Sequence, residues 1–577
     1  MEKFVTETQE VSKIGNGQQQ LHRSVGLFGL TMISLGSIIG SGWLLGASKA
    51  ATHAGPSSML SWILATAILG VLALIHAELG TAYPVAGGTA RFPAFAFGRL
   101  AGFAAGWAAW LQAVALAPVE VEASLTYLDN INWVSTHLHL LNTKSSTLTA
   151  SGFVWATLLM VLFTAINLVG VKVMSESNSA AVVWKAAVPV LTIVVLLSLS
   201  FHPGNFHAGG GFFPHGPQGV FAALPAGVVF AAQGFEQCIQ FAGEARNPQK
   251  HISRAILIAM AVGATTYILL EIAFIGSLDP AALVHGWDNP IAKGSFGPYA
   301  TLATAAGAGW LAYVLYADAF VSPAGTALVY LGTSSRLTYA QSHAGELPKG
   351  FAKLTRRGIP VWAVALAFVI GEISFLPFPS WQSLVGLVTS ATAIMYAFAP
   401  VSLTALRRRD PERRRPYRLK AAPVIAPLGF IAANLVIYWG GFDTTWKIDI
   451  GIALGFVIFA ATQIFKKEPL PISKTDWKGF TWVPVWLAAN VGLGYLGNYD
   501  SGGFRAGGGE LALLPNMADL LFVAAVSLAI YYWAVSLAVT TEEVHELVAQ
   551  DEADLTVTHK SASNTARPLE DDLATTL

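Results

Sequence analysis

The stretch Gly36-Ser37-Ile38-Ile39-Gly40-Ser41-Gly42 decides the fold, because it places glycines and serines in the middle of an apolar segment. The segment runs from about Val25 to Ala47, long enough for a membrane span of roughly 20 residues. Each glycine weakens a helix by about 1 kcal/mol relative to alanine, so the stretch favours a break. Open backbone at membrane depth must line a cavity or hold a ligand. The stretch therefore predicts a binding site made of broken helix, although close helix packing would use the same small residues.

The composition indicates a polytopic membrane protein. Of the 577 residues, 54% are hydrophobic and only 12% are charged, whereas a soluble domain carries roughly 25% charged residues. The mean hydropathy is +0.54. The chain has one cysteine, Cys238, which excludes an intramolecular disulfide. The first residues are polar and lack the apolar core of a signal peptide, so we expect no cleavable leader.

Apolar runs of helical length recur along the chain and predict an all-α membrane protein with 12–14 spans. The well-defined runs are 25–47, 56–82, 92–127, 152–170, 178–201, 219–243, 253–277, 297–332, 360–376, 381–405, 421–440 and 447–465. Two weaker runs follow at 480–496 and 517–539. The run 480–496 is short and rich in tryptophan, so it could lie at the membrane interface instead of spanning.

The spans and loops divide the chain into regions, which we expect to be a cytoplasmic tail (1–24), a ten-helix core (25–406), a basic cytoplasmic loop (407–420), accessory transmembrane helices (421–540) and a cytoplasmic C-terminal tail (541–577). Lysine and arginine gather in every second loop, and such loops favour the cytoplasm. We therefore expect a multi-pass protein of the cell membrane with both termini cytoplasmic. The arginine run at 407–415 is interpreted as a solvated anchor, with acidic lipid headgroups as an alternative ligand.

A second interrupted span contains Phe230-Ala231-Ala232-Gln233-Gly234-Phe235-Glu236-Gln237. Gln233 and Glu236 place polar groups at membrane depth beside Gly234, where they are costly unless they face a cavity or each other. Interruptions in the first and sixth spans are the pattern that an inverted repeat of five spans leaves in a sequence. The two interruptions together predict one shared site in a five-plus-five inverted-repeat transporter fold with extra C-terminal helices.

Several motifs, in order along the chain, resemble the amino acid permeases of the amino acid–polyamine–organocation superfamily. They are Gly36–Gly42, Ala77–Thr89, Gly234–Glu236 with Gly243–Pro248, and Ser334–Leu337 through Gly345–Pro348 and Gly358–Pro360. Within that family, Pro118–Ser124 and Gly40–Trp43 are similar to the bacterial aspartate:proton symporter branch. The family usually has twelve spans, so the residues after about Glu468 depart from its pattern.

The resemblance implies that the two breaks bind the groups that all amino acids share. Amide N–H groups around Ser41 and Gly42 would hold the substrate carboxylate, as a helix N-terminus holds an anion. The carbonyl of Ile38 would face the ammonium, and Phe230 would form an aromatic gate. The expected substrate-binding residues are Ile38, Gly40, Ser41, Gly42, Phe230, Gln233 and Gly234.

Four ionisable side chains within the predicted spans are candidates for coupling or gating: Lys185, Glu236, Glu120 and Glu122. The resemblance implies that Lys185 stands where sodium-coupled relatives bind sodium and that its proton traffic is linked to transport; a lysine that snorkels to lipid headgroups is the alternative. Glu236 could link helices, take up a proton, or be a neutral structural acid. Glu120 and Glu122 point to different helix faces, so we expect at least one to face inward.

We therefore expect a transporter and not an enzyme, since the chain shows no nucleophile elbow, P-loop or metal-spaced cluster. The expected function is proton-coupled uptake, by alternating access, of an amino acid such as aspartate or glutamate. The alternative is an exchanger or a carrier of neutral or cationic amino acids or amines. The acidic side chains of Glu120 and Glu122 would suit a cationic substrate better than aspartate. We expect no metal, no cofactor besides the coupling proton, and no nucleic acid. The partners are the amino acid and the lipid bilayer, and the sequence does not indicate an oligomeric state.

Overall fold

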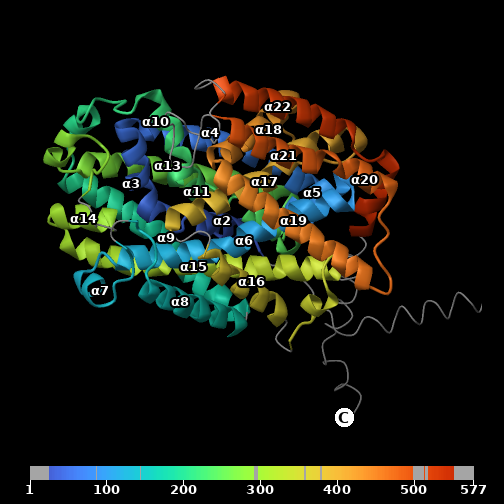
Figure 1. The fold of residues 1–577 in the computed structure, drawn as a ribbon, viewed down its shortest axis with the longest axis horizontal. Coiled ribbons are helices and arrows are strands. Elements are labelled where there is room, and N and C mark those ends of the chain that lie inside the picture. The colour runs from blue at the N-terminus through green and yellow to red at the C-terminus, as the bar shows by residue number, and fades with distance from the viewer. Residues whose placement is uncertain are drawn as a thin grey trace, which may run out of the picture.

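The computed structural model describes residues 25–85, 87–142, 145–169, 171–291, 297–355, 359–376, 380–497, 513 and 518–551. The predicted tail over 1–24 and most of the one over 541–577 lie outside these residues. The described residues form helices packed in one bundle and no strand beyond isolated bridges, which confirms the all-α class (Figure 1).

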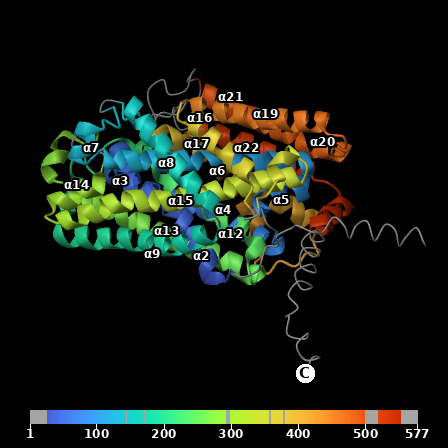
Figure 2. The same cartoon turned by 90° about the horizontal axis from the view of Figure 1, so that it is seen from below.

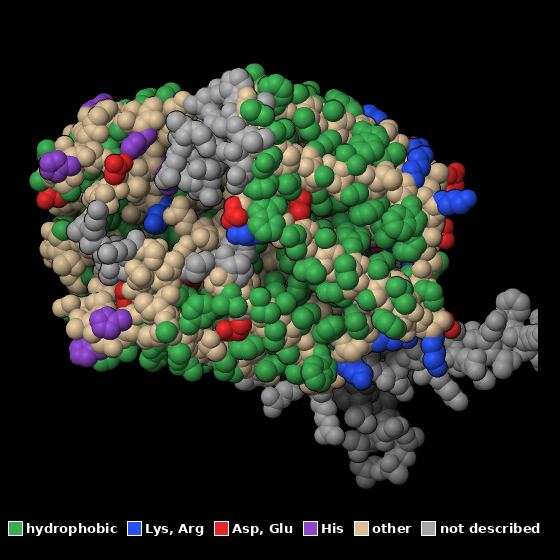
Figure 3. Space-filling model, viewed as in Figure 1, with side chains coloured by type: hydrophobic (Ala, Val, Ile, Leu, Met, Phe, Trp, Pro, Cys, Tyr) green, Lys and Arg blue, Asp and Glu red, His purple; other side chains and the backbone are tan. Residues whose placement is uncertain are grey.

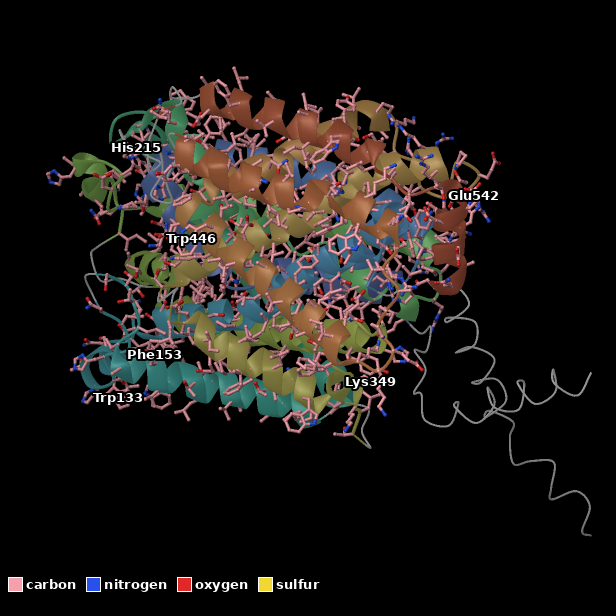
Figure 4. The ribbon with its side chains drawn as sticks, turned by 45° about the vertical axis from the view of Figure 1, so that its right-hand side comes forward. Trp133, Phe153, His215, Lys349, Trp446 and Glu542 are labelled. Carbon is pink, nitrogen blue, oxygen red and sulfur yellow. The ribbon has the colours of Figure 1, made fainter. Side chains whose placement is uncertain are left out.

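The bundle has two ends that differ in charge. His215 and Trp133 lie at one end, and Lys349 and Glu542 lie at the other (Figure 4). In Figure 3 the lysine and arginine side chains gather at the second end, and hydrophobic side chains cover much of the surface between the ends. We call these the histidine end and the arginine end.

The first span is broken, as predicted, into α2 (Leu27–Ile38) and α3 (Gly42–Ala54), and α4 (Ser58–Ala82) runs back. The sixth span is also broken, which confirms the second predicted interruption. Its pieces are α10 (Gly216–Ala222), the π-helical turn η3 (Leu224–Val228), α11 (Val229–Ala232) and α12 (Gln237–Gln240). The two breaks fall five spans apart, as an inverted five-span repeat requires.

Long helices surround the broken spans. They are α6 (Arg99–Leu128), α8 (Ala150–Val169), α9 (Val171–Leu199), α13 (Pro248–Ser277), α15 (Gly309–His343), α16 (Val361–Ser374) and α17 (Trp381–Arg409). Helix α15 packs against both α6 and α9, and α9 also packs against α13, so these helices form a wall beside the breaks (Figure 2). The short helices are α7 (Asn132–His137), η1 (Gly55–Ser57), η2 (Pro203–His207), η4 (Ala242–Glu244), η5 (Pro280–His285) and η6 (Lys349–Ala352).

Two predicted spans begin too early in the sequence. The run 92–127 contains the end of a separate helix, α5 (Gly88–Phe97), and α6 begins only after Gly98 at φ 90°. The run 297–332 likewise contains α14 (Pro298–Ala305), which is separated from α15 by a turn with Gly307 at φ 79°. Positive φ ends a right-handed helix at glycine, although the apolar character of the sequence continues.

The C-terminal helices cover one side of the core, against α17 and α6. They are α18 (Ala422–Trp439), α19 (Phe442–Phe465), α20 (Lys474–Phe480), α21 (Trp482–Leu496) and α22 (Ala518–Ser536). In the described part of the chain, 11 helical segments are long and apolar enough to cross a membrane, and Leu27–Ile38 and Val361–Ser374 are apolar but shorter. Helix α22 is among the 11, whereas α21 has 15 residues and is not. A span over 480–496 stays a prediction.

The arginine run is partly built into the protein. Helix α17 continues to Arg409, beyond the predicted core boundary at 406. Arg407 Nε donates to Glu78 Oε1 at 2.8 Å, and Arg415 Nε lies 3.3 Å from the same oxygen. Glu78 is fully buried and also accepts from the amide of Leu419 at 2.6 Å. For these two arginines the interpretation as a solvated anchor is therefore wrong, because a buried carboxylate requires their charge.

Residues 541–551 form a further α-helix that lies against the core at the arginine end. Arg91 Nε on α5 lies 3.3 Å from Asp551, and the amide of Val539 donates to Ala96 O at 3.0 Å. Thr475 Oγ1 donates to Glu543 at 2.6 Å. The described start of the predicted C-terminal tail is thus held to the bundle.

Candidate substrate site

The first break leaves the carbonyl of Ile38 and the amide of Ser41 without helical partners, and side chains from other helices bind both groups. Helix α2 ends at Ile38, and Ile39 has φ −86° and ψ 86° before α3 starts at Gly42. The carbonyl of Ile38 accepts from the Tyr267 hydroxyl at 2.7 Å. The amide of Ser41, which we expected to be free for the substrate carboxylate, instead donates to Glu120 Oε2 at 2.9 Å. The break is therefore stabilised by α13 and α6.

Glycines at the break permit contacts that no larger residue would allow. A Cβ atom on Gly40 would lie 2.6 Å from Glu120 Oε1, and one on Gly42 would lie 2.6 Å from the Cβ of Ala231. Ala231 belongs to α11, which is part of the other broken span. The small residues thus serve both of the uses considered from the sequence, the opening of the helix and the close packing of two spans.

The second break crosses the first directly. Helix α11 ends at Ala232, after which Gly234 has φ 114°. A Cβ atom on Gly234 would lie 3.0 Å from the carbonyl carbon of Ser37. One turn earlier, Ser34 Oγ donates to Phe235 O at 2.9 Å and accepts from the amide of Cys238 at 3.3 Å. The two breaks therefore form a single packed unit.

A small cavity lies where the two breaks meet. It is lined by Ser37, Ile38, Gly40, Gly42, Leu116, Glu120, Phe230, Gln233, Thr326 and Tyr330. The lining includes most of the predicted substrate-binding residues and one predicted coupling acid. Of the other two substrate-binding predictions, Ser41 reaches the site through its bond to Glu120, and Gly234 lies behind it against Ser37.

Two aromatic rings border the site on the α17 side. Phe230 meets Trp381 edge-on, with ring centroids 6.0 Å apart and an interplanar angle of 86°. The indole Nε1 of Trp381 donates to Ser41 Oγ at 3.3 Å. Trp381 of α17 thus contacts both broken spans, at Phe230 and at Ser41. A gating role for Phe230 stays a prediction.

Lys185 is buried beside the site and does not reach the surface of the bundle. Its side chain is 1% exposed, and its Nζ donates to Gly36 O and to Thr326 Oγ1, each at 2.6 Å. Lys185 also interacts electrostatically with Glu120. The lysine therefore joins the first break to α15, and the snorkelling alternative is wrong.

Glu236 lies outside the cavity and links three elements. It accepts from the hydroxyl of Tyr396 on α17 and from Gln237 Nε2 at 3.1 Å. Gln237 in turn accepts from Thr333 Oγ1 on α15 at 3.2 Å. The described contacts fit the predicted role in linking helices, and a proton role stays a prediction.

Glu122 is separated from the site. It is fully buried, and neither of its carboxylate oxygens has a hydrogen-bond partner among the residues that the structure describes. It does not line the cavity, whereas Glu120 does. Both acids face the interior, but only Glu120 joins the predicted substrate-binding residues.

Several residues that line or contact the site were not predicted: Leu116, Tyr267, Thr326, Tyr330, Trp381 and Tyr396. The aromatic residues lie in apolar spans and give no distinctive signal in the sequence. Thr326 does give a signal in the sequence, because Asp318, Ser322 and Thr326 are spaced by four residues and so share one face of a helix.

Comparison with known proteins identifies the family of the chain. A family model described as "Amino acid permease" matches residues 25–478. The chain is 37% identical over 532 residues to the glutamate/serine transporter AimA of Bacillus subtilis, covering 91% of this chain and 95% of that protein. It is 34% identical over 528 residues to the aspartate-proton symporter of the same organism, covering 91% and 97%. It is 30% identical over 456 residues to the branched-chain amino acid permease BcaP of Lactococcus lactis, covering 74% and 92%. With both breaks in place around one site, the chain belongs to the amino acid permease family and is a membrane transporter, not an enzyme.

Proposed function

We propose that the protein imports an acidic amino acid, aspartate or glutamate, together with a proton. The names of two relatives at 37% and 34% identity support the substrate class, and one of them includes proton symport. The observation that carries the proposal is the bond between the Ser41 amide and Glu120, beside Lys185.

Glu120 gives a physical reason for coupling. Its carboxylate accepts from the Ser41 amide, which is the group that a substrate carboxylate needs at the start of α3. A hydrogen bond to a charged acceptor is about twice as strong as one to a neutral acceptor. A proton on Glu120 therefore weakens its hold on Ser41 and releases the amide for the substrate. Proton and substrate then bind together.

The remaining steps follow from the breaks. The substrate ammonium binds at Ile38 O, and Phe230 with Trp381 closes over it. The arginine end faces the cytoplasm, because arginine-rich loops favour that side. The two broken spans then tilt together and open the site toward the arginine end of a cell-membrane protein with cytoplasmic termini.

A second candidate is a carrier or exchanger of neutral or cationic amino acids. The buried Glu120 in the cavity favours it, since a carboxylate attracts a cation more readily than aspartate. The name of one relative, the glutamate/serine transporter AimA, also includes serine.

Uptake into proteoliposomes separates the two candidates. We expect labelled aspartate and glutamate to accumulate only when the lumen is alkaline, while arginine does not accumulate. We expect Glu120→Gln to remove most of the pH dependence of aspartate binding. Accumulation of arginine or serine alone, or aspartate uptake that ignores the pH gradient, would overturn the proposal.

A further inference from the structure

A stripe of polar side chains on α15 leads from the histidine end toward Lys185. Asp318, Ser322 and Thr326 are spaced by four residues and are all buried. Ser322 Oγ donates to Asp318 Oδ1 at 2.7 Å, and Thr326 Oγ1 accepts from Lys185 at 2.6 Å. Asp318 Oδ2 has no hydrogen-bond partner among the described residues. The stripe therefore begins at a carboxylate that is only half satisfied.

Asp318 interacts electrostatically with groups on two neighbouring helices. Among the described residues, the titratable groups that interact with Asp318 are Lys185 on α9 and Tyr127 on α6. Asp318 does not line the substrate cavity.

The charges of this group do not balance. Lys185 interacts with two buried carboxylates, those of Glu120 and Asp318. With all three groups ionised the cluster carries one net negative charge, and an unbalanced buried charge is strongly unfavourable. One bound proton, which converts a carboxylate to a carboxylic acid, makes the cluster neutral. The cluster therefore favours one exchangeable proton.

We propose that Asp318 is a proton-binding site that carries this proton on the histidine-end side of Lys185. Asp318 lies apart from the cavity and holds the proton while the cavity is empty. When the substrate takes the Ser41 amide, the proton passes to Glu120, as the proposed function requires. The negative charge left on Asp318 then pairs with Lys185. This inference rests on the proton coupling proposed above.

The test compares Asp318→Asn with Glu372→Gln, which removes a partly buried carboxylate that accepts from Thr157 on α8, outside the site. Both variants are reconstituted with a pH-sensitive dye in the lumen. Exchange of labelled for unlabelled aspartate without a gradient measures the substrate cycle, and aspartate-driven proton influx measures coupling. For Asp318→Asn we expect exchange within about threefold of wild type and proton influx reduced at least about tenfold. Glu372→Gln should resemble wild type in both.

Wild-type proton influx with Asp318→Asn would overturn the inference. If Asp318→Asn loses both exchange and proton influx, Asp318→Glu, which retains a carboxylate, decides between the explanations. Recovery of proton influx in Asp318→Glu, with a shifted pH profile, supports proton binding. Loss of both activities in Asp318→Glu as well assigns Asp318 a structural role and overturns the inference. Absence of aspartate-driven influx in the wild type would instead overturn the proposed function.

Discussion

At the scale of single residues, Gly42 marks the tightest point between the broken spans. An added Cβ would lie 2.6 Å from the Cβ and 2.7 Å from the Cα of Ala231. Backbone cannot move aside as a side-chain tip can, and overpacking typically destabilises by about 1–3 kcal/mol. We expect Gly42→Ala to lower the melting temperature and to reduce uptake at least about tenfold.

Gly70→Ala is the matched control for this prediction. Gly70 lies within α4 and has open space where a Cβ would point. Alanine there should stabilise the helix by up to about 1 kcal/mol and leave uptake unchanged. Wild-type uptake by Gly42→Ala would show that the two spans need no such close approach.

Tyr267 orients the carbonyl that the proposed site uses for the substrate ammonium. Tyr267→Phe removes the bond to Ile38 O but keeps the ring, which stacks on Trp62 at 4.9 Å. A hydrogen bond contributes about 1 kcal/mol, so substrate affinity measured by thermal shift should fall about fivefold. Tyr299→Phe removes a similar bond to Leu270 O of α13, outside both breaks, and keeps the ring that contacts Trp43, so it should leave affinity unchanged. Equal affinities for both variants would contradict the role of Tyr267.

At the scale of elements, Glu78 connects α4 to the end of α17. Replacing it with glutamine leaves Arg407 and Arg415 without their buried counter-charge. Breaking a buried pair from one side costs about 3–5 kcal/mol, and the partial exposure of Arg407 lowers this to about 3 kcal/mol. We expect a clear fall in melting temperature for Glu78→Gln. The exposed Glu412 of the same loop provides the control, because Glu412→Gln should change stability by less than about 0.5 kcal/mol.

The helices and both breaks could be predicted from the sequence because each depends on local composition. A glycine run marked the break between α2 and α3, polar side chains beside Gly234 marked the break between α11 and α12, and hydropathy marked the long helices. The stops at Gly98 and Gly307 were missed, since the apolar runs continue through them and only backbone geometry ends the helix. The bond between Ser41 and Glu120 was also beyond prediction, because it joins residues 79 positions apart. Pairing of distant side chains is decided by helix packing.

At the scale of the whole molecule, the arginine end should respond to pH through Glu346, in the turn after α15. Burial raises the pKa of this carboxyl to about 7, against a smaller opposing effect of Arg91 and Arg99. The folded state thus binds a proton that the unfolded state releases near 4.5. Stability should therefore be highest below pH 4.5 and fall as the pH rises toward 7.

This effect can be measured as the difference between wild type and Glu346→Gln across pH 5–8. Glutamine cannot ionise, so we expect its advantage in unfolding free energy to grow by about 1–2 kcal/mol over this range. Glu468→Gln, in an exposed loop, should show no such trend. Parallel curves for wild type and Glu346→Gln would contradict a buried, proton-binding carboxyl at this position.

The position of Cys238 gives the protein an intrinsic chemical reporter. It is the one cysteine of the chain, it is fully buried, and its amide contacts Ser34 where α12 crosses α2. A maleimide reagent can reach this thiol only when the crossing opens. The alkylation rate of the unmodified protein therefore reports how often α12 separates from α2. The variant Cys238→Ser has no cysteine, so labels can be placed at chosen positions elsewhere.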